Sequence, residues 1–415
     1  MATRWVPDLS RSLWRVGGFR DLWLSQTVTL VGTNVTLLAL PLVGLFFLDA
    51  SAFEVGLLWA IEYVPIMLVG LPVGVWVERL PLRMVMIVAD VGRAAALLIV
   101  PVALWLDFLS MPLLYVVTFV IGLGTLFFDV AQLSILPAIV EEDRLVDANG
   151  KLELSRSVAQ IGGPGLGGGL IQWLTAPLAI LADMVTYLAS AYFVMRLPKA
   201  PRPEPATEKF SLRSEIVDGM RFVFGHSLIR PLLLCATLAE LAFAAVLALQ
   251  VVFAADELHL TPAVIGIALA VGNGGGVVGA LLAEPFARKL GTGTAFMVAI
   301  VLFTGGSIIL PLSQGAVTFA AGMFVVYLGA YIFNVLQVSL CQAVTPTNLL
   351  GRMNSVFRFA TWGVIPIGAA GGGLLVDSIG LRNVFWIAAA LNVLSFLPPL
   401  FSAIPKMRNY IEESA

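Results

Sequence analysis

The sequence has few of the residues on which soluble enzymes and nucleic-acid-binding proteins depend. Only 12% of its 415 residues are charged, whereas a soluble chain carries about 25%. The net charge is −2, so the chain has no broad basic surface for nucleic acid. The two cysteines, Cys235 and Cys341, lie in apolar segments without CxxC spacing, and we interpret them as packing residues.

Histidines and nucleotide-binding motifs are equally scarce. The two histidines, His226 and His259, lie near the ends of apolar segments, and no cluster of metal-ligating residues accompanies them. No lysine follows the glycine-rich segment 162–169, which argues against a phosphate-binding P-loop. The start of the chain lacks a signal-peptide pattern and is interpreted as a cytosolic lead-in. We therefore expect no cofactor, no metal and no enzymatic activity.

Long apolar segments dominate the chain instead. Hydrophobic residues make up 59% of it, and they gather in runs of the roughly 20 residues that a bilayer-spanning helix needs. The predicted spans are 22–48, 54–77, 83–105, 112–139, 152–173, 178–196, 230–254, 262–284, 294–312, 316–343, 354–375 and 383–403. This pattern predicts an all-α integral membrane protein with about 12 transmembrane helices.

One long polar segment separates the first six spans from the last six. It opens with four prolines, which cannot continue a helix, and an amphipathic stretch follows over 211–226. That stretch predicts a helix lying on the membrane surface. We therefore divide the chain into an N-terminal six-helix bundle at 1–197, a cytoplasmic linker at 198–229 and a C-terminal six-helix bundle at 230–415.

The basic residues between the spans indicate how the chain is oriented. Nearly all of them fall on the side of the linker and of both termini. They are Arg79, Arg83, Arg144, Lys151, Arg288, Lys289 and Arg352. Arg382 is the only basic residue assigned to the opposite side. Because cytoplasmic loops carry an excess of Lys and Arg, both termini are predicted to be cytoplasmic in a multi-pass protein of the inner membrane.

A short charged segment follows the second span. It contains Gly74, Glu78, Arg79 and Arg83. This spacing resembles the signature of the major facilitator superfamily, although Glu78 replaces the usual Asp and Pro81 the usual Gly. A carboxylate here can lie at the N-terminal end of a helix from the other half, where the helix dipole favours negative charge. The resemblance implies a conformational latch; an ordinary turn is the alternative.

The fifth span contains a second motif. Its members are Gly163, Pro164, Gly167 and Gly168. This Gly-Pro-x-x-Gly-Gly pattern resembles the fifth-helix motif of major facilitator antiporters. Proline kinks a helix, and glycines allow a neighbouring helix to approach closely. The resemblance implies antiport, while a packing interface without influence on transport direction is the alternative.

Further matches spread over nearly the whole chain. They are the segments 19–26, 127–131, 148–152, 219–223 and 352–355. These segments resemble one branch of the same superfamily, a bacterial group that includes macrolide, multidrug and siderophore exporters. The resemblance implies the major facilitator fold, with two pseudo-symmetric six-helix bundles, and export of a small molecule across the lipid bilayer.

Several ionisable residues fall at membrane depth, where such residues face a bundle interior or a water-filled cavity. Arg93 and Asp129 both lie about ten residues from the inner ends of their spans, roughly 15 Å deep. Asp90 lies three residues before Arg93 and faces the same side of its helix. We predict a buried ionic network of Asp90, Arg93, Asp129 and Arg156. The network is either structural or includes Asp129 as a group that exchanges a proton.

Glu240 is the main candidate for proton coupling. It lies about ten residues into the seventh span, and no basic residue of the second half lies at a similar depth. Burial disfavours the ionised carboxyl, which suits a proton carrier or a contact for a cationic substrate. A permanently protonated, hydrogen-bonded carboxyl is the alternative. Glu62 is a weaker candidate of the same kind, and Asp183 is interpreted as structural.

The resemblance places the first, fourth, seventh and tenth spans around a central cavity. The candidate cavity residues on these spans are Gln26, Asn34, Phe127, Phe243, Tyr331, Asn334 and Gln337. Their aromatic members suit the broad apolar wall of a ligand pocket. Helix packing is the alternative for each of them.

These features together predict a secondary active transporter that works by alternating access. We expect a monomer that exports amphipathic organic compounds, such as drugs or secondary metabolites, in exchange for protons. A proton-symporting or facilitative importer of a small organic solute is the main alternative. A membrane-embedded enzyme and a transport-inactive sensor are two further classes, and the absence of added soluble domains argues against both.

Overall fold

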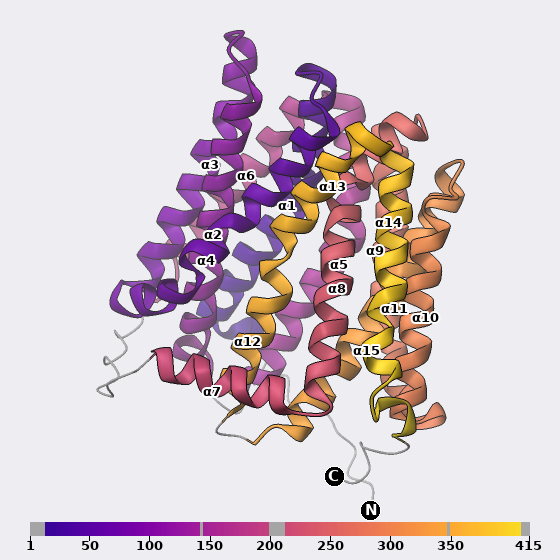
Figure 1. Ribbon diagram of the computed structural model, residues 1–415. Helices are drawn as coiled ribbons and strands as arrows, with labels where there is room; N and C mark the ends of the chain where they lie inside the picture. The colour runs from indigo at the N-terminus through magenta and orange to yellow at the C-terminus, as the bar shows by residue number, and fades with distance from the viewer. Residues whose placement is uncertain (1–12, 142–143, 199–211, 347–348, 408–415) are drawn as a thin grey trace, which may run out of the picture.

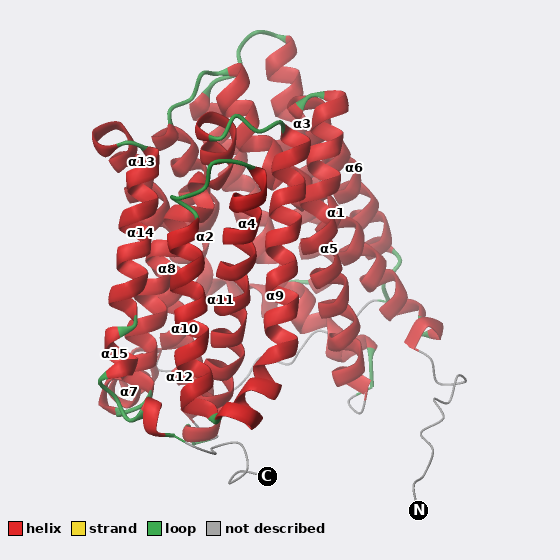
Figure 2. Cartoon of the chain, turned by 90° about the vertical axis from the view of Figure 1, so that its right-hand side faces the viewer, coloured by secondary structure: helices red, strands yellow, loops and turns green. Residues whose placement is uncertain are grey.

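The computed structural model describes residues 13–141, 144–198, 212–346 and 349–407. Every regular element in these ranges is helical, and Figure 2 shows no strand among them. Eleven helices of the described residues are long and apolar enough to cross a membrane. The predicted all-α membrane fold is confirmed.

The first six spans form the N-terminal bundle. Its helices are α1 (Gly17–Phe47), α2 (Ala52–Arg79), α3 (Leu82–Trp105), α4 (Met111–Ile139), α5 (Leu145–Leu174) and α6 (Ala176–Met195). Helix α1 packs against α5 and α6, α3 packs against α4 and α6, and α2 packs against α4. Helix α5 is not among the eleven apolar helices, because its glycines and its charged first half make it less hydrophobic than the others.

The last six spans form the C-terminal bundle, which stands beside the first (Figure 1). Its helices are α8 (Ile229–Val252) with a π-helical extension η4 (Phe253–Glu257), α9 (Pro262–Leu290), α10 (Thr292–Ile309), α11 (Ala316–Val344), α12 (Leu350–Gly363), α13 (Ile365–Ile379), α14 (Leu381–Ser395) and α15 (Leu397–Leu400). The last two predicted spans are broken helices, α12–α13 and α14–α15. Each break precedes a proline, Pro366 or Pro398, which cannot donate a backbone hydrogen bond.

The linker contains helix α7 (Leu212–Gly225), which lies across the ends of the other helices (Figure 1). It packs against α12 and buries Val223, while Val217, Met220 and Phe224 on it remain exposed. Apolar side chains left exposed on a surface helix suit contact with lipid. We call the end of the molecule where α7 lies the linker end, and the opposite end the far end.

The two bundles close on each other at the far end. Helix α5 packs against α9 there, and α2 packs against α13. Glycines make both contacts possible: a Cβ on Gly266 would overlap the carbonyl oxygen of Pro164, and one on Gly56 would lie 2.8 Å from that of Ala369. Any larger residue at these glycines would therefore push the bundles apart.

Arg382, the one basic residue predicted on the far side, has a local explanation. Its Nε donates to Glu257 Oε1 at 2.9 Å, and its Nη1 donates to the carbonyl oxygens of Pro311 (2.6 Å) and Ser313 (3.0 Å). Its charge is balanced within the C-terminal bundle, which accounts for a basic residue at this end.

Candidate functional site

A cavity with a volume of about 680 Å³ lies in the C-terminal bundle. Its walls come from α8, α10, α11, α12 and α14. It extends from Phe243, in the middle of the bundle, to Gln342 and Asn354 toward the linker end. The volume falls within the range of about 300–1,000 Å³ that is usual for sites of small organic ligands. We call it the main cavity.

Glu240 lies on the wall of the main cavity, half-buried, near the middle of α8. It is roughly 17 Å along the helix from Ile229. No ion pair or hydrogen bond to Glu240 occurs among the described residues. Arg358 lines the same cavity, but its guanidinium stacks over the Trp362 ring at 4.6 Å. A carboxyl in this setting is free to bind a proton or a cation.

Most of the predicted cavity residues do line a cavity. Those on the main cavity are Phe243, Tyr331, Asn334 and Gln337. Asn34 lines a second cavity of about 230 Å³, which lies between the two bundles. We call this second cavity the interbundle chamber. Tyr331 lines both cavities, so the chamber adjoins the main cavity.

Two of the predicted cavity residues, Gln26 and Phe127, line neither the main cavity nor the chamber, so their place at a cavity stays a prediction. Gln26 is buried in the N-terminal bundle beside Thr29, which donates to its backbone carbonyl oxygen. Phe127 stacks against Trp76 of α2, with 6.5 Å between ring centroids. The sequence predicts how deep in the membrane both residues lie. It does not predict which side of their helices faces a cavity.

The chamber also contains polar residues that sequence reasoning missed. Gln160 of α5 and Asn273 of α9 face each other across the bundles, and the Asn273 amide donates to the backbone oxygen of Gln160. The Tyr331 hydroxyl lies 3.5 Å from Gln160 Oε1. Gln160 and Asn273 are neutral amides at membrane depth, and this feature of the sequence could have identified them.

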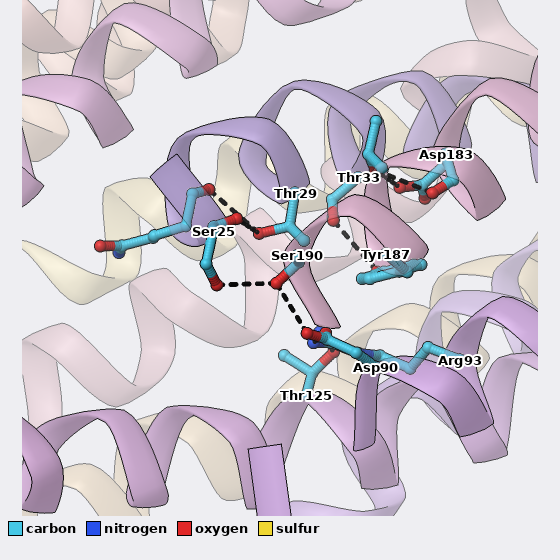
Figure 3. A network of polar contacts seen from close by, with 11 residues as sticks. Ser25, Thr29, Thr33, Asp90, Arg93, Thr125, Asp183, Tyr187 and Ser190 are labelled. Atoms are coloured by element: carbon cyan, nitrogen blue, oxygen red, sulfur yellow. Dashed lines mark hydrogen bonds and ion pairs between the residues drawn. The ribbon is translucent and has the colours of Figure 1, made fainter. Parts of the chain in front are cut away.

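Part of the predicted ionic network is present in the N-terminal bundle (Figure 3). Arg93 Nη2 donates to Asp90 Oδ1 at 2.5 Å, and Ser190 Oγ of α6 donates to Asp90 Oδ2 at 2.6 Å. Ser25 of α1 lies 2.7 Å from Ser190, so the pair joins α1, α3 and α6. The Arg93 guanidinium also lies over the Tyr187 ring at 4.2 Å.

Among the described residues no hydrogen bond or ion pair links Asp129 or Arg156 to this pair, so the full four-residue network stays a prediction. Asp129 is exposed and takes part in no ion pair between described residues, and Arg156 is exposed and lies 3.8 Å from Glu153. Thr125, one turn before Asp129 on α4, faces Arg93 instead and accepts from its Nη1 at 3.2 Å. Asp129 lies one turn further along the same side of α4, where the charges of Arg93 and Arg156 still attract it.

The two remaining acidic candidates lie deeper in the N-terminal bundle. Glu62 lines a small cavity of about 20 Å³. Asp183 is fully buried and accepts hydrogen bonds from Thr36 (2.5 Å) and Thr186 (2.9 Å). These contacts tie α6 to α1, which supports the structural interpretation of Asp183.

Only one residue of the predicted latch can be placed. Gly74 and the side chains of Glu78 and Arg79, in the last turns of α2, lie outside what the structure describes. Arg83 at the start of α3 donates to the carbonyl oxygens of Leu197, at 3.0 Å, and of Met195. Its described hydrogen bonds thus remain within the N-terminal bundle, and the latch stays a prediction.

The glycine motif of α5 contacts two neighbouring helices. A Cβ on Gly163 would overlap the side chain of Asn34, and one on Gly167 would lie 3.0 Å from the Cα of Val35, both on α1. The face with Pro164 and Gly168 packs instead against α9 at the far end. The motif therefore lies at the joint between the bundles, and α5 continues through Pro164.

Comparison with known proteins adds relatives over the whole chain. Residues 22–365 and 232–410 match the model of the Major Facilitator Superfamily. The chain is 25% identical over 400 residues to macrolide efflux protein A of Streptococcus pyogenes, with 94% of this chain and 97% of that protein covered. It is 26% identical over 392 residues to the multidrug efflux pump Tap of Mycolicibacterium fortuitum, with 91% and 93% covered.

A solved structure with a similar fold exists in two conformations. A bacterial homologue of the iron transporter ferroportin in its inward-facing state matches with a TM-score of 0.76 at 17% identity, covering 94% of this chain and 99% of that one. In its outward-facing state the TM-score is 0.58 at 18% identity, with 92% and 98% covered. Both comparisons show that this chain has the same fold as that transporter.

Proposed function

Because this chain belongs to the major facilitator superfamily of transporters, we propose that it exports amphipathic organic compounds by proton antiport. The observation that carries the proposal is Glu240, a carboxyl on the wall of the main cavity without a partner among the described residues. Relatives named for macrolide and multidrug efflux support the direction and the substrate class. Protons and a small organic molecule are then the two species that the cycle exchanges.

The surroundings of Glu240 explain how one site serves both species. A carboxylate inside a membrane protein is stabilised either by a proton or by a nearby cation. Phe243, Tyr331 and Trp362 give the same cavity aromatic rings, on which an apolar or cationic compound can pack. Binding of the compound and binding of the proton at Glu240 therefore exclude each other, which is the requirement for antiport.

The closed far end and the main cavity toward the linker end suit one half of an alternating-access cycle. If the linker end is cytoplasmic, as the excess of basic residues on that side favours, this conformation faces inward. We propose a multi-pass monomer of the inner membrane with both termini cytoplasmic. Rocking of the two bundles would open the far end and expose the cavity outside.

Two other acidic groups belong to the proposal as secondary proton sites. Asp129 is exposed and lies in the field of Arg93 and Arg156, so it is reachable by protons. Glu62 lines its own small cavity in the other bundle. Neither of them lines the main cavity, and we therefore assign the exchange with substrate to Glu240.

Proton flux in inside-out membrane vesicles tests the proposal. The vesicle interior is acidified by respiration, a fluorescent pH probe reports it, and tetraphenylphosphonium, doxorubicin or erythromycin is added. We expect the compound to release protons from the vesicles, and Glu240→Gln to reduce that release at least tenfold at unchanged membrane content. Glu284→Gln, an exposed acid on α9, is the matched control and should behave as the unaltered protein.

Other outcomes point to other transport modes. Substrate-triggered proton release that persists in Glu240→Gln would contradict the role of this carboxyl. Movement of a compound out of the vesicles together with the protons would instead favour the importer.

A further inference from the structure

The interbundle chamber differs in chemistry from the main cavity beside it. None of the residues that line the chamber is charged. Four of them are side-chain amides: Asn34, Gln160, Gln250 and Asn273. They come from α1, α5, α8 and α9, so both bundles contribute. A wall of neutral donors and acceptors suits a ligand group that is itself neutral and forms hydrogen bonds.

Gln250 shows that the amides of the chamber are not fully used inside the protein. The residue is only 9% exposed, and its Oε1 has no hydrogen-bond partner among the described residues. A buried acceptor without a partner is costly to a fold. A ligand hydroxyl or amine that donates to Gln250 Oε1 would remove that cost.

The chamber and the main cavity, which contains Glu240, share part of their walls. Tyr331 lines the chamber and the main cavity. Tyr327 of the chamber wall packs edge-on against Phe243 of the main cavity, with 5.6 Å between ring centroids, and feels the charge of Glu240. Tyr327 and Tyr331 therefore connect the surroundings of the carboxyl with the wall of the chamber.

We propose that the interbundle chamber is a specificity subsite that binds a neutral, hydroxyl- or carbonyl-bearing ring of a compound whose amine lies at Glu240. The inference rests on the proposed function and adds the substrate class: organic amines with a second, hydrogen-bonding end. With a volume of about 230 Å³ the chamber suits a single ring system. A site built to form hydrogen bonds discriminates strongly against an analogue that lacks them.

A ligand bound in the chamber would also lie beside the contact that closes the far end. Pro164 lines the chamber, and its carbonyl oxygen lies against Gly266 in the α5–α9 contact. A ring bound between the amides would touch both bundles just below this contact. Only a compound with a second, hydrogen-bonding end would therefore act directly on the α5–α9 contact, which must part when the far end opens.

Two probes separate this subsite from the rest of the cavity. Doxorubicin has an amine at one end and quinone carbonyls and hydroxyls at the other, whereas tetraphenylphosphonium is a cation without hydrogen-bonding groups. Transport of both into inside-out vesicles is measured for the unaltered protein, Gln250→Met and Asn273→Leu. Met is similar in size to Gln and removes an acceptor that has no partner among the described residues, so Gln250→Met should fold normally.

We expect both variants to lower doxorubicin transport about tenfold and to leave tetraphenylphosphonium transport within twofold. Equal losses for both probes, or no loss for either, would overturn the subsite. So would an unaltered protein that moves tetraphenylphosphonium but not doxorubicin, although the proposed function would then stand. An unaltered protein that moves neither probe against a gradient, nor erythromycin, would overturn the proposed function and the subsite with it.

Discussion

At the scale of single residues, Arg93 is the best-anchored charge within the N-terminal bundle. It contacts Asp90 and Thr125 through its two terminal nitrogens, and its guanidinium lies over the rings of Tyr187 and Phe128. Its side chain is only 5% exposed. An ion pair this deep contributes little net stability when intact, but loss of one partner leaves an uncompensated buried charge.

We therefore predict that Arg93→Leu destabilises the protein by about 3–5 kcal/mol, because Asp90 loses its cation. The double variant Asp90→Asn with Arg93→Leu should recover more than half of that loss, since no buried charge remains. Thermal unfolding in detergent, followed by tryptophan fluorescence, measures both. A double variant that is no more stable than Arg93→Leu would contradict an unpaired Asp90 as the cause of the loss.

The same pair shows how far single residues could be predicted from the sequence. Asp90 and Arg93 are three residues apart on one helix, so their spacing alone predicts contact. Asp129 was assigned to the network from its depth in another span, and depth does not say which way a side chain points. Thr125 takes that position, as a residue one turn away on a helix can. Glu240 could be chosen as a candidate from the sequence because its apolar neighbours along the helix are visible there. A partner on another helix is not.

At the scale of helices, glycines decide where the bundles meet. On α9, Gly266 and Gly274 lie in the same helix but in different surroundings. A Cβ on Gly266 would overlap the carbonyl oxygen of Pro164 on α5, whereas one on Gly274 would have nothing within 4 Å. The first glycine is required by the closed far end, and the second is not.

Gly266→Val should therefore open the far end and lower transport at least tenfold, because the α5–α9 contact cannot form. Gly274→Val is the matched control on the same helix and should retain transport. The opening is measured by labelling a cysteine placed at Leu269 on the chamber wall with a membrane-impermeant thiol reagent from the far side. Unchanged labelling and transport in Gly266→Val would show that the α5–α9 contact tolerates a side chain here and does not require the glycine.

Helices were predicted well, and their partners were not. All twelve predicted spans correspond to helices, because a run of apolar residues is a property of the chain itself. The glycines of α5 predicted close helix contacts, but one face meets α1 and the other meets α9. Which helix packs against which face depends on how the bundles assemble. The residue pattern of a single helix does not reveal that.

At the scale of the whole molecule, the resemblance of scattered motifs to the major facilitator superfamily is confirmed by the family match along the chain. The orientation in the membrane remains a proposal, and it rests on one asymmetry: basic residues gather at the linker end. The same end is where the main cavity reaches Asn354, while Gln314 is exposed at the far end. Orientation and conformation can therefore be tested together.

In a variant with Cys235 and Cys341 replaced by alanine, we predict that a cysteine at Asn354 reacts with a membrane-impermeant thiol reagent in inside-out vesicles and not in intact cells. A cysteine at Gln314 should show the reverse, because it lies at the opposite end. A saturating substrate that drives the bundles outward should then slow labelling at Asn354 without changing it at Gln314. Labelling of Asn354 from outside the cell would invert the topology, and the direction of transport would have to be inverted with it.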